Sequence, residues 1–171
     1  RTANTGIIIL LIFSIPFWTP NAIITTVISE NIKKNISGCQ ASEIKLPKNV
    51  KTINYWAFSR CHSLEVVELN DGLEKIEEVA FAGTKIKSIR IPDSVKIIEH
   101  DAFESCNDLE KVILSKNIST IPIRCFHHCK SLKSIEIPES VTTIEGRAFA
   151  TANLTSIKIP DSVTKLGYGA L

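Results

Sequence analysis

The sequence predicts a β-rich solenoid, in which short turns of chain stack into one elongated core. Three observations support this fold class. Phenylalanines recur at a nearly constant interval, further apolar or small columns keep register with them, and apolar and polar side chains alternate along one segment of each turn. One turn of about 23 residues cannot bury both of its faces, whereas stacked turns form a continuous core.

The phenylalanine column sets the register of the repeat. It runs, at almost equal spacing, through Phe58, Phe81, Phe103, Phe126 and Phe149. Small residues, mostly Ala, precede each Phe, and Cys, Thr or Ala stands three residues after it. Ile, Val or Leu stands five, eight and twelve residues before it. This register predicts five full turns and a truncated sixth over residues 46–171.

One segment of each turn has the two-residue period of a short strand. In the turn that leads to Phe149, Ile135 and Ile137 are expected to point inward, and Ser134 and Glu136 outward. Copies of this segment should pair in parallel. Proline follows directly in most turns, where a missing N–H ends the ladder. The Val-x-x-Ile stretch that comes next is expected to form a second short extended piece, and the Ala-Phe corner to turn the chain back.

The N-terminal residues differ from the repeat. No charged side chain lies between Arg1 and Glu30, and Ile7 to Phe13 is an unbroken apolar run. We consider three interpretations of residues 1–22: a secretory signal peptide, a membrane anchor, or an apolar flap that covers the open end of the domain. Residues 23–45 are predicted to form a degenerate capping turn. The sequence has no Met, and we expect it to be trimmed or a fragment.

The repeat pattern resembles that of a known family. One turn resembles the unit of the BspA-like leucine-rich repeats. The resemblance lies in residues 137–144, Ile-Pro-Glu-Ser-Val-Thr-Thr-Ile, in Ala148-Phe149, and in Cys129-Lys130-Ser131-Leu132. The resemblance covers about residues 40–171. It departs in that the family's Gly survives only as Gly167, and that Asn70 and Ser115 replace the proline. The resemblance implies a curved right-handed solenoid of cell-surface or secreted proteins, some of which bind extracellular-matrix proteins or other cells, and it implies no catalytic residue.

The cysteines and histidines raise the possibility of a metal site or a disulfide. Cys125 and Cys129 flank His127 and His128, but the register places both cysteines inward, and we expect both histidines to point to water. Because four zinc ligands must converge tetrahedrally, no metal or cofactor is predicted. Cys106 and Cys129 fall in adjacent turns, within disulfide range, but their side chains should stack in parallel, and buried reduced thiols are favoured.

Composition narrows the partners and activities. The net charge of +2 is too small to indicate binding to a phosphate backbone, so nucleic acid is not an expected partner. No nucleophile elbow and no phosphate loop is present, so the chain is not expected to be an enzyme. Asn35, Asn117 and Asn153 match the N-glycosylation pattern, which matters only in a eukaryotic secretory route.

The outward face of the predicted sheet is the first candidate protein-binding surface. Its central row should place Lys45, Glu68 and Arg90 in an alternating-charge ladder, and Glu136 beside Lys158. Such a row suits either a solvated, self-neutralised surface or a shallow protein-binding face. Tyr55 and Trp56 either pack under the N-terminal cap or form a lateral hot spot. The candidate protein-binding residues are therefore Lys45, Glu68, Arg90, Lys111, Glu136, Lys158, Tyr55 and Trp56.

These observations predict a non-enzymatic, cell-surface or secreted module that binds a protein partner. Extracellular matrix or a host-cell surface is the expected partner, and membrane association is expected only through the N-terminal apolar segment. Two alternatives remain open: a cytoplasmic structural or regulatory scaffold, and a truncated repeat fragment without a function of its own.

Overall fold

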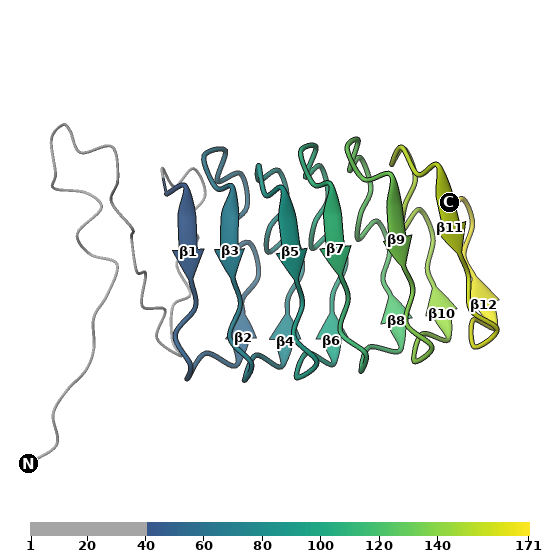
Figure 1. The fold of residues 1–171 in the computed structure, drawn as a ribbon, viewed down its shortest axis with the longest axis horizontal. Helices are drawn as coiled ribbons and strands as arrows, with labels where there is room; N and C mark the ends of the chain where they lie inside the picture. Colours follow the sequence, from purple (N-terminus) through teal and green to yellow (C-terminus); the bar gives the residue numbers. More distant parts are fainter. Residues whose placement is uncertain (1–40) are drawn as a thin grey trace, which may run out of the picture.

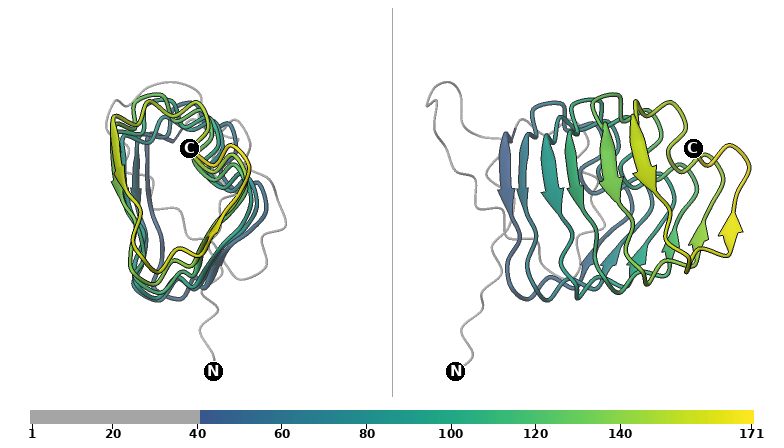
Figure 2. Two further views of the ribbon diagram at one scale, coloured as in Figure 1. Left: turned by 90° about the vertical axis from the view of Figure 1, so that its right-hand side faces the viewer. Right: turned by 45° about the vertical axis from the view of Figure 1, so that its right-hand side comes forward.

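A computed structural model describes residues 41–171 of the chain. Each turn contributes one three-residue strand and one two-residue strand, and the turns stack along a single axis (Figure 1). Seen along this axis, the turns superpose, with the longer strands on one side and the shorter strands on another (Figure 2). The predicted β-solenoid with parallel strands is confirmed. The capping and signal-peptide predictions for residues 1–40 lie outside the described residues.

The three-residue strands form one side of the solenoid, which we call the strand face. Each has a buried or half-buried central residue between two residues that are more exposed, as the alternation predicts. These strands are β1 (Glu43–Lys45), β3 (Val66–Glu68), β5 (Ser88–Arg90), β7 (Lys111–Ile113), β9 (Ser134–Glu136) and β11 (Ser156–Lys158). β1 falls within the segment expected to be a degenerate cap, and it pairs with β3 in regular parallel register.

The two-residue strands are the second extended piece that the sequence predicts after the proline position. They are β2 (Thr52–Ile53), β4 (Lys75–Ile76), β6 (Ile97–Ile98), β8 (Thr120–Ile121), β10 (Thr143–Ile144) and β12 (Lys165–Leu166). They pair in parallel on the opposite side of the core, which we call the short-strand face. Both faces therefore repeat once per turn.

Neither set of strands forms one continuous sheet. The longer strands pair in the orders β1-β3-β5-β7 and β11-β9, and the shorter strands pair in the orders β2-β4-β6 and β12-β10-β8. The breaks fall between β7 and β9 on the strand face and between β6 and β8 on the short-strand face. We call this interruption the seam.

The phenylalanine column forms the centre of the core. All five rings are at most 1% exposed, and successive rings stack with centroids 5.3 to 5.5 Å apart. The inward assignment of the other columns is also confirmed, with Leu166 as an exception at 56% exposure. Leu166 lies on the last strand of the described stack, where no further strand pairs with β12.

The corner around each Phe is a third side of the solenoid, which we call the corner face. Its backbone adopts the left-handed conformation two residues before and two residues after the Phe. Eleven such residues recur in register, and only Gly83 and Gly169 among them are glycines. From Trp56 to Phe149, the N–H groups of these residues and of the Phe donate to carbonyls of the next turn, as Trp56, Phe58 and Arg60 do to Glu78, Ala80 and Ala82. We call this series of bonds the corner ladder.

Candidate functional site

The strand face presents the predicted outward residues to solvent. Lys45, Glu68 and Arg90 are exposed, and the Nζ atom of Lys45 lies 2.8 Å from Oε1 of Glu68. Their side chains are each 59% exposed, so solvent screens the pair, and its contribution to stability is small. The charges of this face therefore contribute little to the stability of the fold.

The predicted charge ladder does not continue past this pair. Within residues 41–171, Arg90 makes no ion pair: Glu68 on one side pairs with Lys45, and the register partner of Arg90 on the other side is Ile113. Glu136 is paired in register with Lys158, but their charged groups form no ion pair in the described part of the chain. Lys111 and Lys158 are exposed on the same face. The candidate residues thus share one surface but not one network.

Tyr55 and Trp56 form an aromatic pair on the edge of the corner face. Their rings stack with centroids 5.2 Å apart, and the residues are 54% and 40% exposed. The N–H of Tyr55 donates to the carboxylate of Glu77 at 2.9 Å, and the N–H of Trp56 donates to the carbonyl of Glu78 at 3.1 Å. These two bonds to the next turn fix the backbone that presents both rings to solvent.

A groove of about 450 Å³ begins at this aromatic pair and runs along the corner face. Small residues line it, with Ser59 at 5% and Ala82 at 7% exposure, and Arg60 and Glu78 add one charge of each sign. Gly83, at φ +71°, lies against Arg60, and a Cβ there would meet Arg60 Cγ at 3.7 Å. We call this groove the corner groove.

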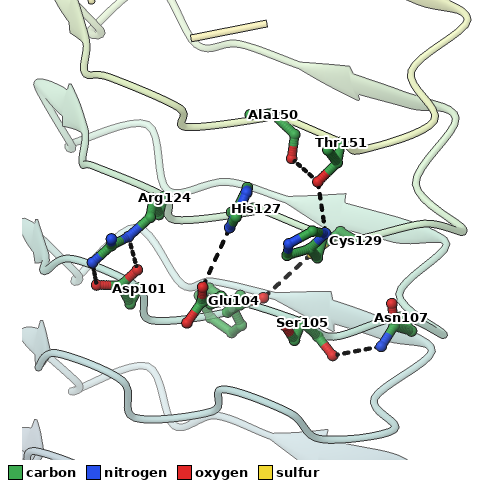
Figure 3. Close-up of polar contacts among 11 residues, drawn as sticks. Asp101, Glu104, Ser105, Asn107, Arg124, His127, Cys129, Ala150 and Thr151 are labelled. Atoms are coloured by element: carbon green, nitrogen blue, oxygen red, sulfur yellow. Dashed lines mark hydrogen bonds and ion pairs between the residues drawn. The ribbon is translucent and has the colours of Figure 1, made fainter. Parts of the chain in front are cut away.

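An ion pair lines the corner groove farther along. The guanidinium of Arg124 donates to both carboxylate oxygens of Asp101, at 2.6 and 2.8 Å (Figure 3). The Asp101 side chain is only 5% exposed, and these hydrogen bonds raise the pKa of Arg124. The sequence prediction missed this pair. The signal was present, because opposite charges stand in the same column of two adjacent turns.

The prediction that His127 and His128 point to water is wrong. Both residues are half-buried, and their rings lie 3.9 Å apart between centroids. Nδ1 of His127 lies 3.2 Å from a Glu104 oxygen, and Nδ1 of His128 lies 2.8 Å from Oγ1 of Thr151 (Figure 3). Each histidine therefore connects its turn to a neighbouring turn, because the corner places side chains of the same column directly above one another.

Cys106, Cys125 and Cys129 are buried free thiols, and Cys61 is also buried. The thiols of Cys106 and Cys129 donate to the carbonyls of Phe81 and Phe103 at 3.2 and 3.3 Å. Burial raises the pKa of Cys106 to about 11 and raises the pKa values of Cys125 and Cys129 further. In residues 41–171, no three His, Cys, Asp or Glu side chains converge on a point that could hold a metal ion.

Two of the glycosylation-pattern asparagines have a role in stacking. The side-chain amides of Asn117 and Asn153 donate to the carbonyls of Asp93 and Lys130, each at 2.7 Å. Both amide nitrogens are thus engaged with the preceding turn, and Asn35 lies outside the described residues.

Between residues 41 and 171, no helix is long and apolar enough to span a membrane.

Taken together, the repeat and its geometry define a leucine-rich-repeat type of solenoid. The sequence matches the family described as "BspA type Leucine rich repeat region", in six copies over residues 26–149 and 69–171. The chain belongs to this family, so the resemblance noted from the sequence is confirmed. Proteins of this family are generally protein-binding and typically non-catalytic. No curated protein matches the sequence.

Solved structures of bacterial leucine-rich-repeat proteins share the fold. The Treponema pallidum leucine-rich repeat protein is 30% identical, with a TM-score of 0.74 over 84% of this chain and 73% of that one. A protein from Bacteroides ovatus is 28% identical, with a TM-score of 0.53 over 74% of this chain and 45% of that one. The pneumococcal vaccine antigen PcpA is 26% identical, with a TM-score of 0.63 over 71% of this chain and 31% of that one. The chain thus spans less than half of the length of the second and third proteins.

Proposed function

We propose that this chain is a non-enzymatic binding module of a cell-surface or secreted protein, and that it attaches to a protein of the extracellular matrix or of a host-cell surface. The observation that carries the proposal is the stacked, exposed Tyr55–Trp56 pair, which lines the corner groove. Tyrosine and tryptophan are enriched among the residues that dominate binding energy, and these two lose little freedom on binding.

The strand face supplies the second part of the proposed interface. Lys45 and Arg90 belong to an extended charged row, and such a row orients a partner and speeds its encounter more than it adds affinity. The aromatic pair then acts as the anchor, and the charged row as its polar surround. The description of PcpA as a vaccine antigen supports placement at a surface, because such an antigen must be reached by antibodies.

The experiment measures binding of the full chain to immobilised collagen, laminin and fibronectin and to intact host cells. We expect one of these probes to bind saturably, the double variant Tyr55→Ala/Trp56→Ala to weaken binding at least about tenfold, and Lys45→Glu/Arg90→Glu to slow association. Ile97→Ala is the matched control, since Ile97 is 51% exposed but lies on the short-strand face. Binding to none of the probes, or equal loss from the control, would contradict the proposal.

Localisation of the natural gene product separates this function from an intracellular scaffold. Antibody staining of intact cells should detect the repeat at the surface or in the medium. Signal that requires permeabilised cells would favour the scaffold.

A further inference from the structure

The seam has an identifiable cause on the short-strand face. In four other described turns, the residue that follows the Ile column donates its N–H to the Ile carbonyl of the preceding turn. Glu77, Glu99 and Glu145 do so at 2.9 Å, and Gly167 does so at 2.7 Å. Pro122 occupies this column between β6 and β8, and proline has no N–H to give. The carbonyl of Ile98 therefore loses its donor.

Pro122 also lacks a second bond that the glutamates of this column make. Their carboxylates accept a backbone N–H from the preceding turn: Glu77 from Tyr55, Glu99 from Glu78, and Glu145 from Ile123, at 2.9 to 3.2 Å. The equivalent donor below Pro122 is the N–H of His100. One substitution in the repeat thus removes two bonds between the same two turns.

The strand face lacks backbone hydrogen bonds between the neighbouring strands β7 and β9. On β7, Lys111 and Ile113 bond toward β5, so alternation points the N–H and C=O of Val112 toward β9. Within the described residues, no backbone bond crosses from β7 to β9. A groove of about 390 Å³ lies there, with Val112 to Leu114 on one wall and Glu136 to Pro138 on the other.

Besides side-chain contacts such as His127–Glu104 and His100–Glu145, two backbone connections cross the seam in the described residues, and they lie at opposite edges of the two strand faces. One is the corner ladder, in which the N–H groups of Asp101, Phe103 and Ser105 donate to the carbonyls of Ile123, Cys125 and His127, respectively, at 2.8 to 3.0 Å. Just beyond this ladder, the N–H of Ser131 donates to the carbonyl of Asn107 at 3.1 Å. The Asp101–Arg124 ion pair reinforces this ladder. The other is the covalent link of residues 114–119, held to the preceding turn by Ser115 and Asn117.

We propose that the seam is a hinge, at which the block from β1 to β7 and the block from β8 to β12 tilt relative to each other. The axis runs from the corner ladder to the 114–119 link. Because the two strand faces lie on opposite sides of this axis, tilting opens one face and closes the other. Core contacts, such as the Phe103–Phe126 stack at 5.5 Å, limit the motion. The strand face of the proposed interface would thereby change its curvature for a partner, and only this consequence rests on the proposed function.

Distance measurements on the full chain test the hinge directly. Spin labels on unnatural amino acids at Ser88 and Ser156 span the seam and leave the native thiols unlabelled. Labels at Glu43 and Lys111 span the same number of strand steps within one block, and they provide the matched control. We expect a broader distance distribution for the pair that spans the seam. Equal widths would overturn the hinge.

Two variants change the seam itself. Pro122→Glu installs the residue that the repeat uses elsewhere, and should narrow the Ser88–Ser156 distribution and slow exchange of the His100 amide about tenfold. Glu145→Pro should create a second seam between β8 and β10 and speed exchange of the Ile123 amide. If Glu145→Pro fails to fold, Pro122→Glu alone decides. An unchanged width in folded Pro122→Glu would show that the missing bonds do not control any tilt.

Discussion

The strand faces and the corner face are built from the same repeat, yet only the corner face connects every pair of neighbouring turns in residues 41–171. Strand ladders break between β6 and β8 and between β7 and β9, whereas corner bonds continue from Trp56 through Phe149. The difference shows that regular strands are not what makes this solenoid continuous. Continuity comes from an irregular backbone that the stacked rings hold in place.

The corner achieves this at a local conformational cost. Nine residues other than glycine adopt positive φ there, including Val79 at 60° and Trp56 at 59°. Such positions cost about 1–2 kcal/mol each in isolation. Each corner offsets that cost with interturn hydrogen bonds and a buried ring.

The largest expected effect comes from removing one ring of the corner. Phe103→Ala should lower the free energy of unfolding by about 3–5 kcal/mol, because Phe103 is fully buried and contacts the rings of two neighbouring turns. Urea titration followed by circular dichroism measures this. A decrease in the free energy of unfolding below about 1 kcal/mol, typical of a surface position, would show that the phenylalanine column is not the centre of the core.

The next effect separates the two members of the corner ion pair. Arg124→Ala leaves the nearly buried Asp101 carboxylate unpaired, and should cost about 2–3 kcal/mol. Asp101→Asn should cost only about 1 kcal/mol, because Asn tolerates positive φ and Arg124, at 43% side-chain exposure, can turn to water. Chemical denaturation of both variants gives the comparison. Equal losses would mean that solvent reaches Asp101 more freely than its burial indicates.

Alkaline pH should weaken the corner through its thiols. Burial raises the pKa of Cys106 from 9.0 to about 11, so the unfolded chain releases this proton first. Stability is then full below pH 9 and falls as pH rises toward 11, by up to about 1.4 kcal/mol per pH unit for each such thiol. Cys106→Thr, the residue type of Thr84 in the same column, should make this decline shallower. Unfolding curves between pH 8 and 11 test the slopes, and identical slopes would contradict the assignment.

The smallest effect belongs to the strand face. Glu136→Ala should leave the free energy of unfolding within about 0.5 kcal/mol of the parent, since Glu136 points outward and forms no ion pair in the described residues. The same urea titration gives the value. A cost equal to that of Phe103→Ala would reverse the assignment of inward and outward faces.

The sequence predicted whatever depends on similar side chains recurring at a fixed spacing. The five rings, the inward Ile columns and the Lys45–Glu68 pair all follow from side chains that recur one turn apart. The corner ladder did not follow, because its left-handed positions hold residues as different as Trp56, Asp101 and Arg147, with no shared chemistry to mark them. His127 was misplaced because its partner, Glu104, is found only by comparing neighbouring turns. The effect of Pro122 was missed for a related reason, since it depends on an acceptor in the preceding turn, the carbonyl of Ile98. Whether the candidate residues bind a partner stays a prediction.

The corner ladder also gives the molecule a net dipole along the solenoid axis. Alternate strand amides point both ways along the solenoid axis, so their dipoles cancel. Every corner bond runs the same way, with the N–H directed toward later turns and the carbonyl toward earlier ones. The aligned peptide dipoles, about 3.5 D each, therefore add. Their positive pole faces the C-terminal direction, opposite to that of an α-helix. Two stacks of this kind can join through their corners only head to tail, because a reversed stack would set donor against donor.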